Sequence, residues 1–306
     1  MILENQRLLV YRMRPSLSTW RTVAWNGIRF DAPASWDASK IGGRYLLLES
    51  GAEPVMEIRW EPITGRFSHR KHLRRLSGGR KGRAVTEAPL SADWEEALQR
   101  FDALGFAWSG NAIHARGAIL FCPVCRTASL IQFFQPANRT LGQTAGRVLS
   151  SFRDHPEGGL TLWSMFDVKA RIPNRFTLSH HRFQAGRFEM GFADTRRRLT
   201  LYRWGPAEIL LKESDLARFA GTQVVLPDRR VSGLDTSDNR VAEWQTDPPE
   251  TLGAWLRRRM MSKTAFRRFR VWHRPAANRI LGALAEGGKA FDPELFERIC
   301  AGYETV

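Results

Sequence analysis

The chain has 306 residues, of which 43% are hydrophobic and 11% aromatic, so it can bury a substantial core in one large domain or two ordinary ones. A charged fraction of 25% beside so many aromatic residues excludes a disordered chain, and three cysteines exclude a disulfide scaffold. No apolar run reaches the ~20 residues of a membrane-spanning helix. Glu4 and Arg7 interrupt the first residues, so we expect no signal peptide and a cytoplasmic protein.

The charge balance is strongly basic. Lys and Arg number 47 against 31 Asp and Glu, which gives a net charge of +16, and 40 of the basic residues are Arg. Such a field attracts nucleic acid, anionic lipid or an acidic protein surface. Residues 1–155 carry 22 basic and 13 acidic side chains, and residues 156–306 carry 25 and 18. This even spread is also compatible with a compositional preference for Arg that has no functional role.

In chain order, two similar series of landmarks follow one another. The first series is Pro33, Trp36, Gly43-Arg44 and Arg59-Trp60, and the second is Pro173, Phe176, Gly186-Arg187 and Arg203-Trp204. The segments 147–152 and 298–303 also match near the end of each series. We therefore expect an N-terminal extension (1–19) and two tandem copies (20–155 and 160–306). The Pro/Gly-rich segment 155–159 is typical of a domain junction.

Each copy is expected to begin with strands. Residues 55–60 and 199–204 alternate apolar and polar side chains, which is the pattern of a half-buried strand. Extended segments at 44–49 and 187–192 precede them, so each pair predicts an antiparallel hairpin. The remaining extended segments are 117–121, 127–134 and 269–273.

Helices are expected after these hairpins and at the end of each copy. Ser91 is a candidate N-cap for a helix that starts at residue 92, and residues 213–220 are its expected counterpart. Residues 141–152 and 293–303 predict closing helices. The sequence thus predicts an α+β fold of two tandem copies, each an antiparallel β-sheet flanked by helices, related by a pseudo-two-fold axis.

The order of these elements, with the extended run Ala32-Pro33-Ala34-Ser35-Trp36 at its start, resembles the Mog1/PsbP-like α/β/α family. The resemblance would cover nearly the whole chain as a tandem pair, but its motif is short and structural. It implies a binding module, since the family includes Ran-interacting factors, photosystem accessory subunits and bacterial chaperones of secreted effectors. None of those functions has a residue signature that can be carried over to this chain.

Cys122-Pro-Val-Cys125 has the spacing of a metal-binding turn. A structural zinc ion needs four ligands, so two more would have to come from His69, His72, His114 or His155. The corresponding place in the second copy, which we expect near His273, offers one ligand at most. We therefore favour a strand turn with two small buried thiols and no cofactor, with zinc at Cys122 and Cys125 as the alternative.

Two Arg-rich stretches, 69–83 and 257–270, are the candidate binding surfaces. Their basic residues are Arg70, Lys71, Arg74, Arg75, Arg80, Lys81 and Arg83 in the first, and Arg257, Arg258 and Arg259 in the second. The first stretch runs into glycines and predicts a mobile loop, whereas the second predicts a basic amphipathic helix that continues into a strand. Such a helix can lie on nucleic acid or make a peripheral membrane contact, or simply pack with a solvated Arg face.

The sequence contains no motif of the common hydrolase, metalloprotease or nucleotide-binding classes. We therefore expect a non-catalytic interaction, adaptor or chaperone-like protein that binds an acidic or amphipathic protein partner. The alternatives are a nucleic-acid-binding protein that uses the two Arg-rich stretches and, third, an enzyme without a recognisable motif.

Overall fold

The computed structural model describes residues 20–78, 85–110, 113–136, 142–156, 158–227, 229–231, 240–246, 266–288 and 290–306. The described chain is mostly β-strand with some helices, and its strands form three antiparallel sheets. The core contains many Trp, Phe and Ile side chains beside Leu and Ala, and aromatic and β-branched side chains pack well on the pleated surface of a sheet.

The first half of the chain contains β1 (Trp20–Trp25), β2 (Ile28–Pro33), β3 (Asp37–Gly42), β4 (Tyr45–Ser50), β5 (Glu53–Pro62), α1 (His69–Gly78), β6 (Val85–Glu87), α2 (Ala92–Leu98), β7 (Asp102–Ser109), β8 (Ile113–Phe121), β9 (Thr127–Pro136) and α3 (Gly142–Ser151). The second half contains β10 (Leu160–Met165), β11 (Val168–Pro173), β12 (Thr177–Gln184), β13 (Arg187–Ala193), β14 (Arg197–Trp204), α4 (Ala207–Leu210), α5 (Leu216–Gln223), β15 (Arg229–Arg230), β16 (Val241–Gln245), β17 (Phe266–Arg274), the 3₁₀ turn η1 (Pro275–Ala277), β18 (Arg279–Gly287), α7 (Pro293–Ala301) and β19 (Glu304–Thr305).

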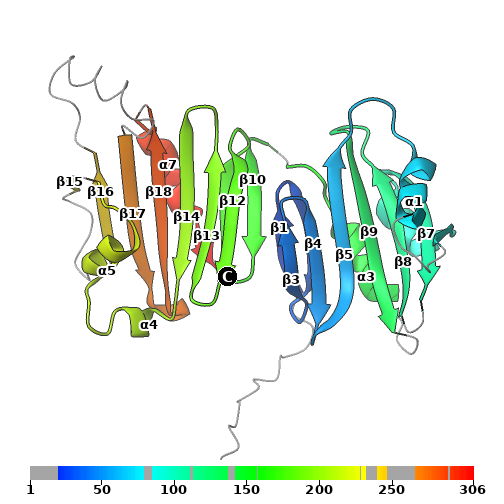
Figure 1. Ribbon diagram of the computed structural model, residues 1–306, viewed down its shortest axis with the longest axis horizontal. Helices are drawn as coiled ribbons and strands as arrows, with labels where there is room; N and C mark the ends of the chain where they lie inside the picture. The colour runs from blue at the N-terminus through cyan, green and yellow to red at the C-terminus, as the bar shows by residue number, and fades with distance from the viewer. Residues whose placement is uncertain are drawn as a thin grey trace, which may run out of the picture.

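Two seven-stranded sheets share one strand order. The first runs β3-β4-β5-β9-β8-β7-β6 and the second β12-β13-β14-β18-β17-β16-β15, so each strand of one sheet has a counterpart in the other. A smaller sheet, β19-β11-β10-β1-β2, lies between them and takes strands from both halves. Figure 1 shows the two large sheets side by side along the long axis of the molecule.

The two halves are joined by antiparallel pairing of β1 with β10, in which Ala24 faces Ser164. These strands hold corresponding places, because each opens a hairpin whose second strand ends at the matched prolines, Pro33 or Pro173. An antiparallel pair of corresponding strands has local two-fold symmetry. The Ser164 hydroxyl also donates to the carbonyl oxygen of Thr22 at 2.8 Å across the pair.

One large core spans this junction. Trp25 is fully buried, and its ring meets Trp163 edge-on at a centroid distance of 5.2 Å. His181, from the second half, lies 5.1 Å from the Trp25 ring and contacts the carbonyl oxygen of Ile41 at 3.3 Å. Side chains from α2, α3 and α7 join the same core, so we call the sheet faces that they cover the inner faces.

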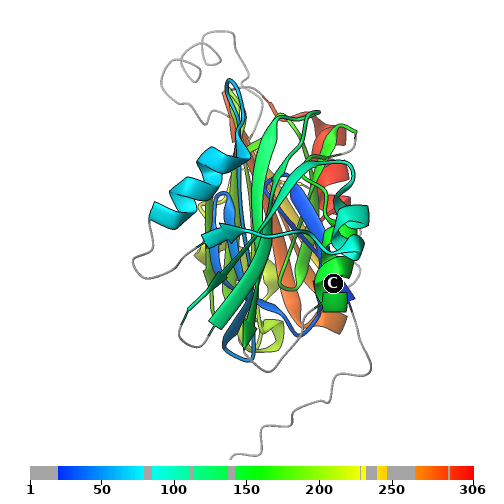
Figure 2. The same ribbon diagram turned by 90° about the vertical axis from the view of Figure 1, so that its right-hand side faces the viewer.

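The outer faces of the large sheets carry two smaller clusters. α1 packs Leu73 on the outer face of the first sheet, and α5 packs Phe219 on that of the second. Figure 2 shows α1 on one side of the sheets and α3 and α7 on the other. Each large sheet therefore has helices on both faces.

The sequence comparison matches Trp60 with Trp204. In the structure, however, the position that corresponds to Trp60 is held by Arg203, one residue earlier. Both tryptophans lie in corresponding strands, β5 and β14, but Trp60 belongs to the inner core whereas Trp204 packs in the outer cluster. Arg203 takes the inward place instead: Trp60 donates to the carbonyl oxygen of Asn26 at 3.2 Å, and Arg203 contacts Asp167 in the corresponding turn. A slip of one residue reverses the face of every side chain in a strand.

Two helix expectations also need correction. The stretch expected as a mobile loop forms helix α1 over His69–Gly78, because Leu73 gives it a buried side chain. Helix α5 corresponds to α1 and not to α2, since α5 follows β14 whereas α2 lies between β6 and β7. Ser91 is the N-cap residue of α2, but its side chain makes no capping hydrogen bond. The predicted closing helices are confirmed as α3 and α7.

We predict that Trp25→Ala lowers the free energy of unfolding by about 3–5 kcal/mol, because it leaves a cavity at the junction and removes the hydrogen bond from Trp25 Nε1 to the carbonyl oxygen of Gly42 (2.7 Å). Chemical denaturation followed by tryptophan fluorescence and circular dichroism measures the change.

The matched control is Leu160→Ala in β10, a side chain that is 45% exposed, for which we expect a change within about 0.5 kcal/mol. An equally small effect of both substitutions would show that the stability of the chain does not depend on this junction.

Candidate functional site

The described part of the basic stretch 69–83 lies on α1. Arg70, Lys71 and Arg74 are exposed along the helix, which has no acidic residue in its first turn. Arg75 belongs to the same helix. The other predicted binding residues, Arg80, Lys81, Arg83, Arg257, Arg258 and Arg259, lie outside the described residues, and so does most of the predicted helix at 257–270. Its described end is strand, because β17 begins at Phe266.

Helix α1 is fixed to the sheet edge by polar contacts as well as by Leu73. His69 Nε2 contacts the carbonyl oxygen of Asp102 at 2.9 Å, and His72 Nε2 lies 3.3 Å from Glu61 Oε1. Arg70 pairs with Glu87 of β6 at 3.4 Å, where the Arg70 side chain is 81% exposed. The helix therefore presents positive charge to solvent from a defined position.

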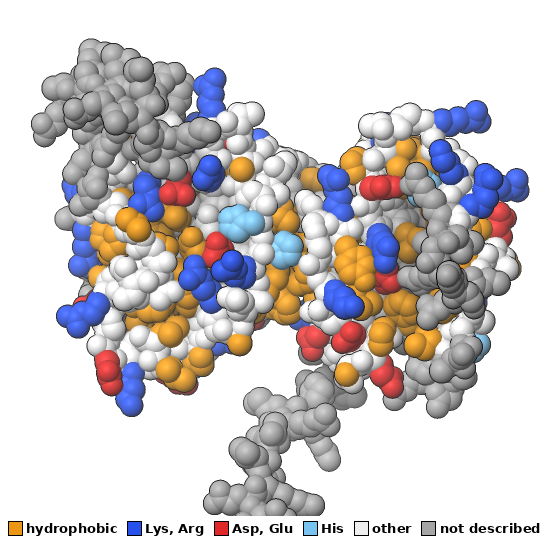
Figure 3. Space-filling model, in the orientation of Figure 1, with side chains coloured by type: hydrophobic (Ala, Val, Ile, Leu, Met, Phe, Trp, Pro, Cys, Tyr) orange, Lys and Arg blue, Asp and Glu red, His pale blue; other side chains and the backbone are white. Residues whose placement is uncertain are grey.

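A cavity of about 350 Å³ opens beside α1 on the outer face of the first sheet. Its floor contains Ile119, Ala128 and Leu130, and its rim contains Arg44, Arg59, Glu61 and His72. α1 contacts β6, β7 and β8, so it leaves this part of the sheet open. Figure 3 shows hydrophobic side chains with Lys and Arg beside them on this face. We call this feature the α1 groove.

A buried carboxylate positions one rim residue of the α1 groove. Glu57 is 4% exposed and accepts from Arg59 Nε at 2.5 Å and from Gln132 Nε2 at 2.9 Å. Gln132 in turn accepts from Trp108 Nε1 at 2.9 Å. The Arg59 guanidinium also lies 5.0 Å from the centroid of the Tyr45 ring. Arg59 is therefore held in place before any ligand arrives.

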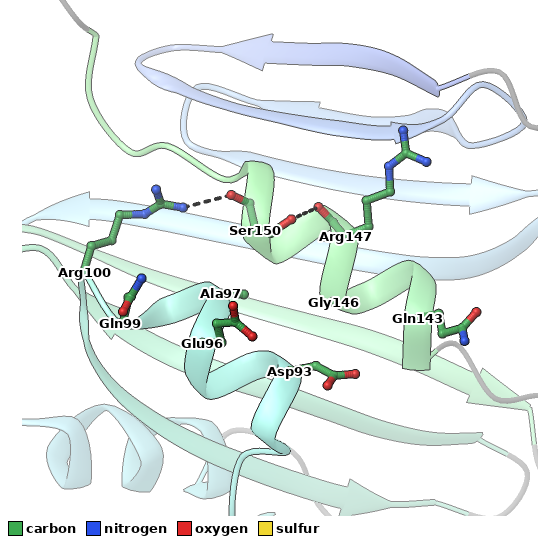
Figure 4. Close-up of a pocket in the computed structure, with 9 residues that line it drawn as sticks. All are labelled: Asp93, Glu96, Ala97, Gln99, Arg100, Gln143, Gly146, Arg147 and Ser150. Atoms are coloured by element: carbon green, nitrogen blue, oxygen red, sulfur yellow. Dashed lines mark hydrogen bonds between the residues drawn. The ribbon is translucent and has the colours of Figure 1, made fainter.

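A second cavity, of about 540 Å³, lies between α2 and α3. Figure 4 shows Asp93 and Glu96 on α2, facing α3, with Arg100 at the other end of the groove. Arg100 donates to the carbonyl oxygen of Ser150 at 3.2 Å, which links the two helices. Arg147 lies against the Trp20 ring, 4.0 Å from its centroid. This groove is polar and open, so it offers little apolar surface to a ligand.

The two candidate metal ligands lie at the turn between β8 and β9. Cys122 is buried and Cys125 half-buried, and Asp154 and His155 from the segment after α3 lie beside them. Of the four expected histidines, only His155 lies in this group of described residues; His69 and His72 are on α1, and His114 contacts Ser109. The carboxylate of Asp154 is a further potential ligand, which was not predicted from the sequence. Burial, and then the neighbouring Asp154, raise the pKa of the Cys125 thiol to about 12, although hydrogen bonds from Thr127 oppose the rise.

Charged side chains are also buried in the second half. Asp167, at the turn between β10 and β11, accepts from Arg203 Nε at 3.1 Å and from Arg279 Nε at 2.8 Å. Burial acts to raise the pKa of Asp167, but the hydrogen bonds from these two guanidinium groups outweigh it and hold the pKa below its ordinary value. Glu243, 1% exposed, is paired with Arg268 and Arg270. These ion pairs connect strands within the fold.

Comparison with known proteins gives a match in structure only. No family model matches the chain, and no curated protein matches its sequence. The structure is similar to the Ran-binding protein Mog1p of Saccharomyces cerevisiae, with 7% identity and a TM-score of 0.32, over 45% of this chain and 96% of that one. A protein from Bacteroides thetaiotaomicron matches with 12% identity and a TM-score of 0.27, over 47% of this chain and 49% of that one. The similarity to Mog1p extends over about half of this chain. Among the described helices, none has the length and apolar character to cross a membrane.

We predict that Asp167→Asn lowers the free energy of unfolding by roughly 2–3 kcal/mol at pH 7, because it removes charge-assisted hydrogen bonds from two arginines. The pKa of Asp167 is depressed in the folded state, so its contribution is complete above the unfolded-state pKa and declines as the pH falls through the folded-state pKa. Denaturation curves at pH 7 and at about pH 3 should therefore show the difference between variant and wild type shrinking in acid.

Asp37→Asn is the control, because the Asp37 side chain is 78% exposed and lies 3.4 Å from Arg21. We expect a change of at most about 0.5 kcal/mol at either pH. A difference for Asp167→Asn that does not vary with pH would contradict the assigned ion pairing.

Proposed function

We propose that the chain is a non-catalytic interaction protein that binds an acidic, amphipathic segment of a protein partner in the α1 groove. We further propose that it consists of two tandem copies, residues 20–155 and 160–306, preceded by an extension, residues 1–19, and that it acts in the cytoplasm. The α1 groove is the observation that supports this function, because it combines an apolar floor with a cationic rim.

The rim of the groove favours carboxylates. Arg44 and Arg59 stand on it together with His72; Glu61 is the acidic side chain on the rim, and the buried Glu57 pairs with Arg59. A guanidinium group donates two parallel hydrogen bonds to a carboxylate, and Arg59 is already oriented by Glu57. Little conformational freedom is therefore lost when a partner carboxylate binds Arg59.

The floor and size of the groove favour a segment over a folded domain. Ile119, Ala128 and Leu130 offer apolar surface to the apolar side chains of such a segment. A volume of about 350 Å³ is at the small end of the range for ligand pockets, so it accommodates a few side chains. An acidic amphipathic segment can contact both parts of the groove, because its apolar face packs on the floor while its acidic side chains bind the cations of the rim.

The exposed cations of α1 extend this positive surface. Arg70, Lys71 and Arg74 lie along the helix next to the groove, where they would raise the rate at which an acidic partner is captured. In the second half the corresponding face differs, because Phe219 of α5 meets the Trp204 ring edge-on at 5.5 Å. We therefore assign binding to the first copy and a supporting role to the second.

We predict that the double variant Arg44→Glu, Arg74→Glu weakens binding of an acidic amphipathic peptide at least about tenfold, because both exposed cations become repulsive. The probe is a fluorescein-labelled peptide that alternates Glu with Leu and Phe, and fluorescence anisotropy measures its dissociation constant. Proteins captured from native extract by the wild type should be lost by this variant.

The matched control is Arg196→Glu, Arg198→Glu, which makes the same change of charge at two exposed positions of the second half. We expect it to bind the peptide within about twofold of wild type. Equal weakening by both double variants would show that binding depends on net charge alone. Absence of peptide binding and of any captured protein would contradict the proposed function.

A second candidate, nucleic-acid binding, is favoured by the row of exposed cations on α1. Arg suits phosphate as it suits carboxylate, and Arg70, Lys71 and Arg74 are all exposed. Two observations place it second. Acidic side chains, Glu87 and Glu61, lie against the same helix, and the floor of the groove is apolar.

If α1 binds duplex DNA, each phosphate neutralised by its side chains should add about 0.9 to the slope of log affinity against log salt. We expect the variant Arg70→Ala, Lys71→Ala, Arg74→Ala to reduce that slope by about 3. Titrations at several salt concentrations measure it, and a slope that does not change in the variant would remove α1 from this second candidate function.

A further inference from the structure

Four potential metal ligands from two distant segments meet at one end of the first half. Cys122 and Cys125 come from the turn between β8 and β9, and Asp154 and His155 come from the segment that leads from α3 to β10. One ligand atom from each residue lies within 4.8 Å of all the others. This proximity is what a single ion bound by all four residues requires.

The donor atoms lie close to the spacing that a small tetrahedral site requires. Cys125 Sγ lies 3.0 Å from Asp154 Oδ2, and Cys122 Sγ lies 3.8 Å from His155 Nδ1. His155 Nδ1 is also 2.8 Å from Asp154 Oδ1. Zinc binds sulfur at ~2.3 Å and nitrogen or oxygen at ~2.0–2.2 Å, so its ligand atoms lie about 3.3–3.8 Å apart in a tetrahedron. The distance between Cys122 and His155 has that length, and the two shorter contacts of Asp154 are hydrogen bonds that the metal would replace.

The four donors are held in place by the backbone around them. Arg126 has a positive φ of 56°, which turns the chain back after Cys125, and its amide donates to the carbonyl oxygen of Cys122 at 2.9 Å. The other segment is fixed by the bridge between Arg29 and Arg153, immediately before Asp154. Asp154 itself is 7% exposed.

The corresponding turn in the second half shows that the fold does not require these side chains. That turn connects β17 to β18 with the same spacing of paired residues, since Phe121 pairs with Ala128 and His273 pairs with Ile280. Asn278, with φ of 54°, takes the place of Arg126. The register places Arg274 at the position of Cys122 and Ala277 at the position of Cys125. His273 corresponds to Phe121, so it is not the counterpart of a cysteine, contrary to the expectation from the sequence. The same backbone turn thus forms without cysteine.

We propose that Cys122, Cys125, Asp154 and His155 bind one structural zinc ion. Sulfur and imidazole ligands together favour Zn²⁺ over Mg²⁺ or Ca²⁺, which prefer oxygen. The set is complete at four ligands, which is the arrangement of a structural and not a catalytic centre. On binding, each thiol releases its proton to solvent as its sulfur takes the metal, so two protons leave for one Zn²⁺.

The ion would tie the turn between β8 and β9 to the junction that leads into β10. Asp154 directly precedes the Pro/Gly-rich segment 155–159 between the halves, and His155, the first residue of that segment, lines a cavity of about 390 Å³ there with Arg29 and Leu160. Loss of the metal should therefore be felt at the junction as well as at the turn.

The test is to purify the full chain without chelators or metal-affinity resin and to measure metal content by mass spectrometry. We expect roughly one zinc per chain in the wild type and in the control Cys300→Ser, whose thiol is buried in α7 away from the four ligands. We expect almost none in Cys122→Ser, Cys125→Ser. Replacement by Co²⁺ should give thiolate-to-cobalt absorption and the visible bands of a tetrahedral site.

If the double cysteine variant does not fold, a second variant, His155→Ala, still tests the proposal. The His155 side chain is 40% exposed, so His155→Ala should fold, and we expect its zinc affinity in competition with a chelating dye to fall tenfold or more. A chelator should lower the unfolding temperature of the wild type and of Cys300→Ser. Wild-type protein that has no zinc and gives no cobalt–thiolate absorption, or that has a Cys122–Cys125 disulfide, overturns the proposal.

Discussion

The antiparallel pairing of β1 with β10 is the constraint on which the rest of the structure depends. It brings corresponding strands together at Ala24 and Ser164, and so places Trp25 and Trp163 in one core. Each large sheet then turns its inner face toward that shared core and its outer face toward solvent. Because both inner faces are used in this way, a surface for a ligand that is formed by a large sheet itself lies on an outer face or at the ends of the sheet.

The general architecture was predictable because it depends on local patterns. The prolines that end β2 and β11 are single residues with restricted conformations, and the alternation in β5 and β14 identifies each as a strand. The alternation cannot decide which face of β14 meets the shared core, because both faces are buried and Arg203 on the inner face pairs with Asp167, a residue distant in sequence. Helix α1 was missed for a related reason: one buried leucine among basic residues is a weak helical pattern.

The candidate sites were predictable only in part. The spacing of Cys122 and Cys125 indicates a metal site, but Asp154 becomes a neighbour only through the closing helix α3 and the return of the chain to β2. The α1 groove has no motif, since its floor and rim come from β5, β8, β9, a hairpin turn and a helix. Tertiary structure creates such surfaces from residues whose sequence positions carry no shared signal.

The shared core of the two halves has a consequence for assembly. Corresponding strands that pair across a two-fold axis form the kind of interface by which separate identical subunits become a homodimer. When both partners are on one chain, their association no longer depends on protein concentration, because the linker supplies a high effective concentration. In a single chain a substitution changes only one of the two halves, whereas in a homodimer it changes both subunits. The outer faces are therefore free to differ, one being filled by Phe219 and the other left open beside α1.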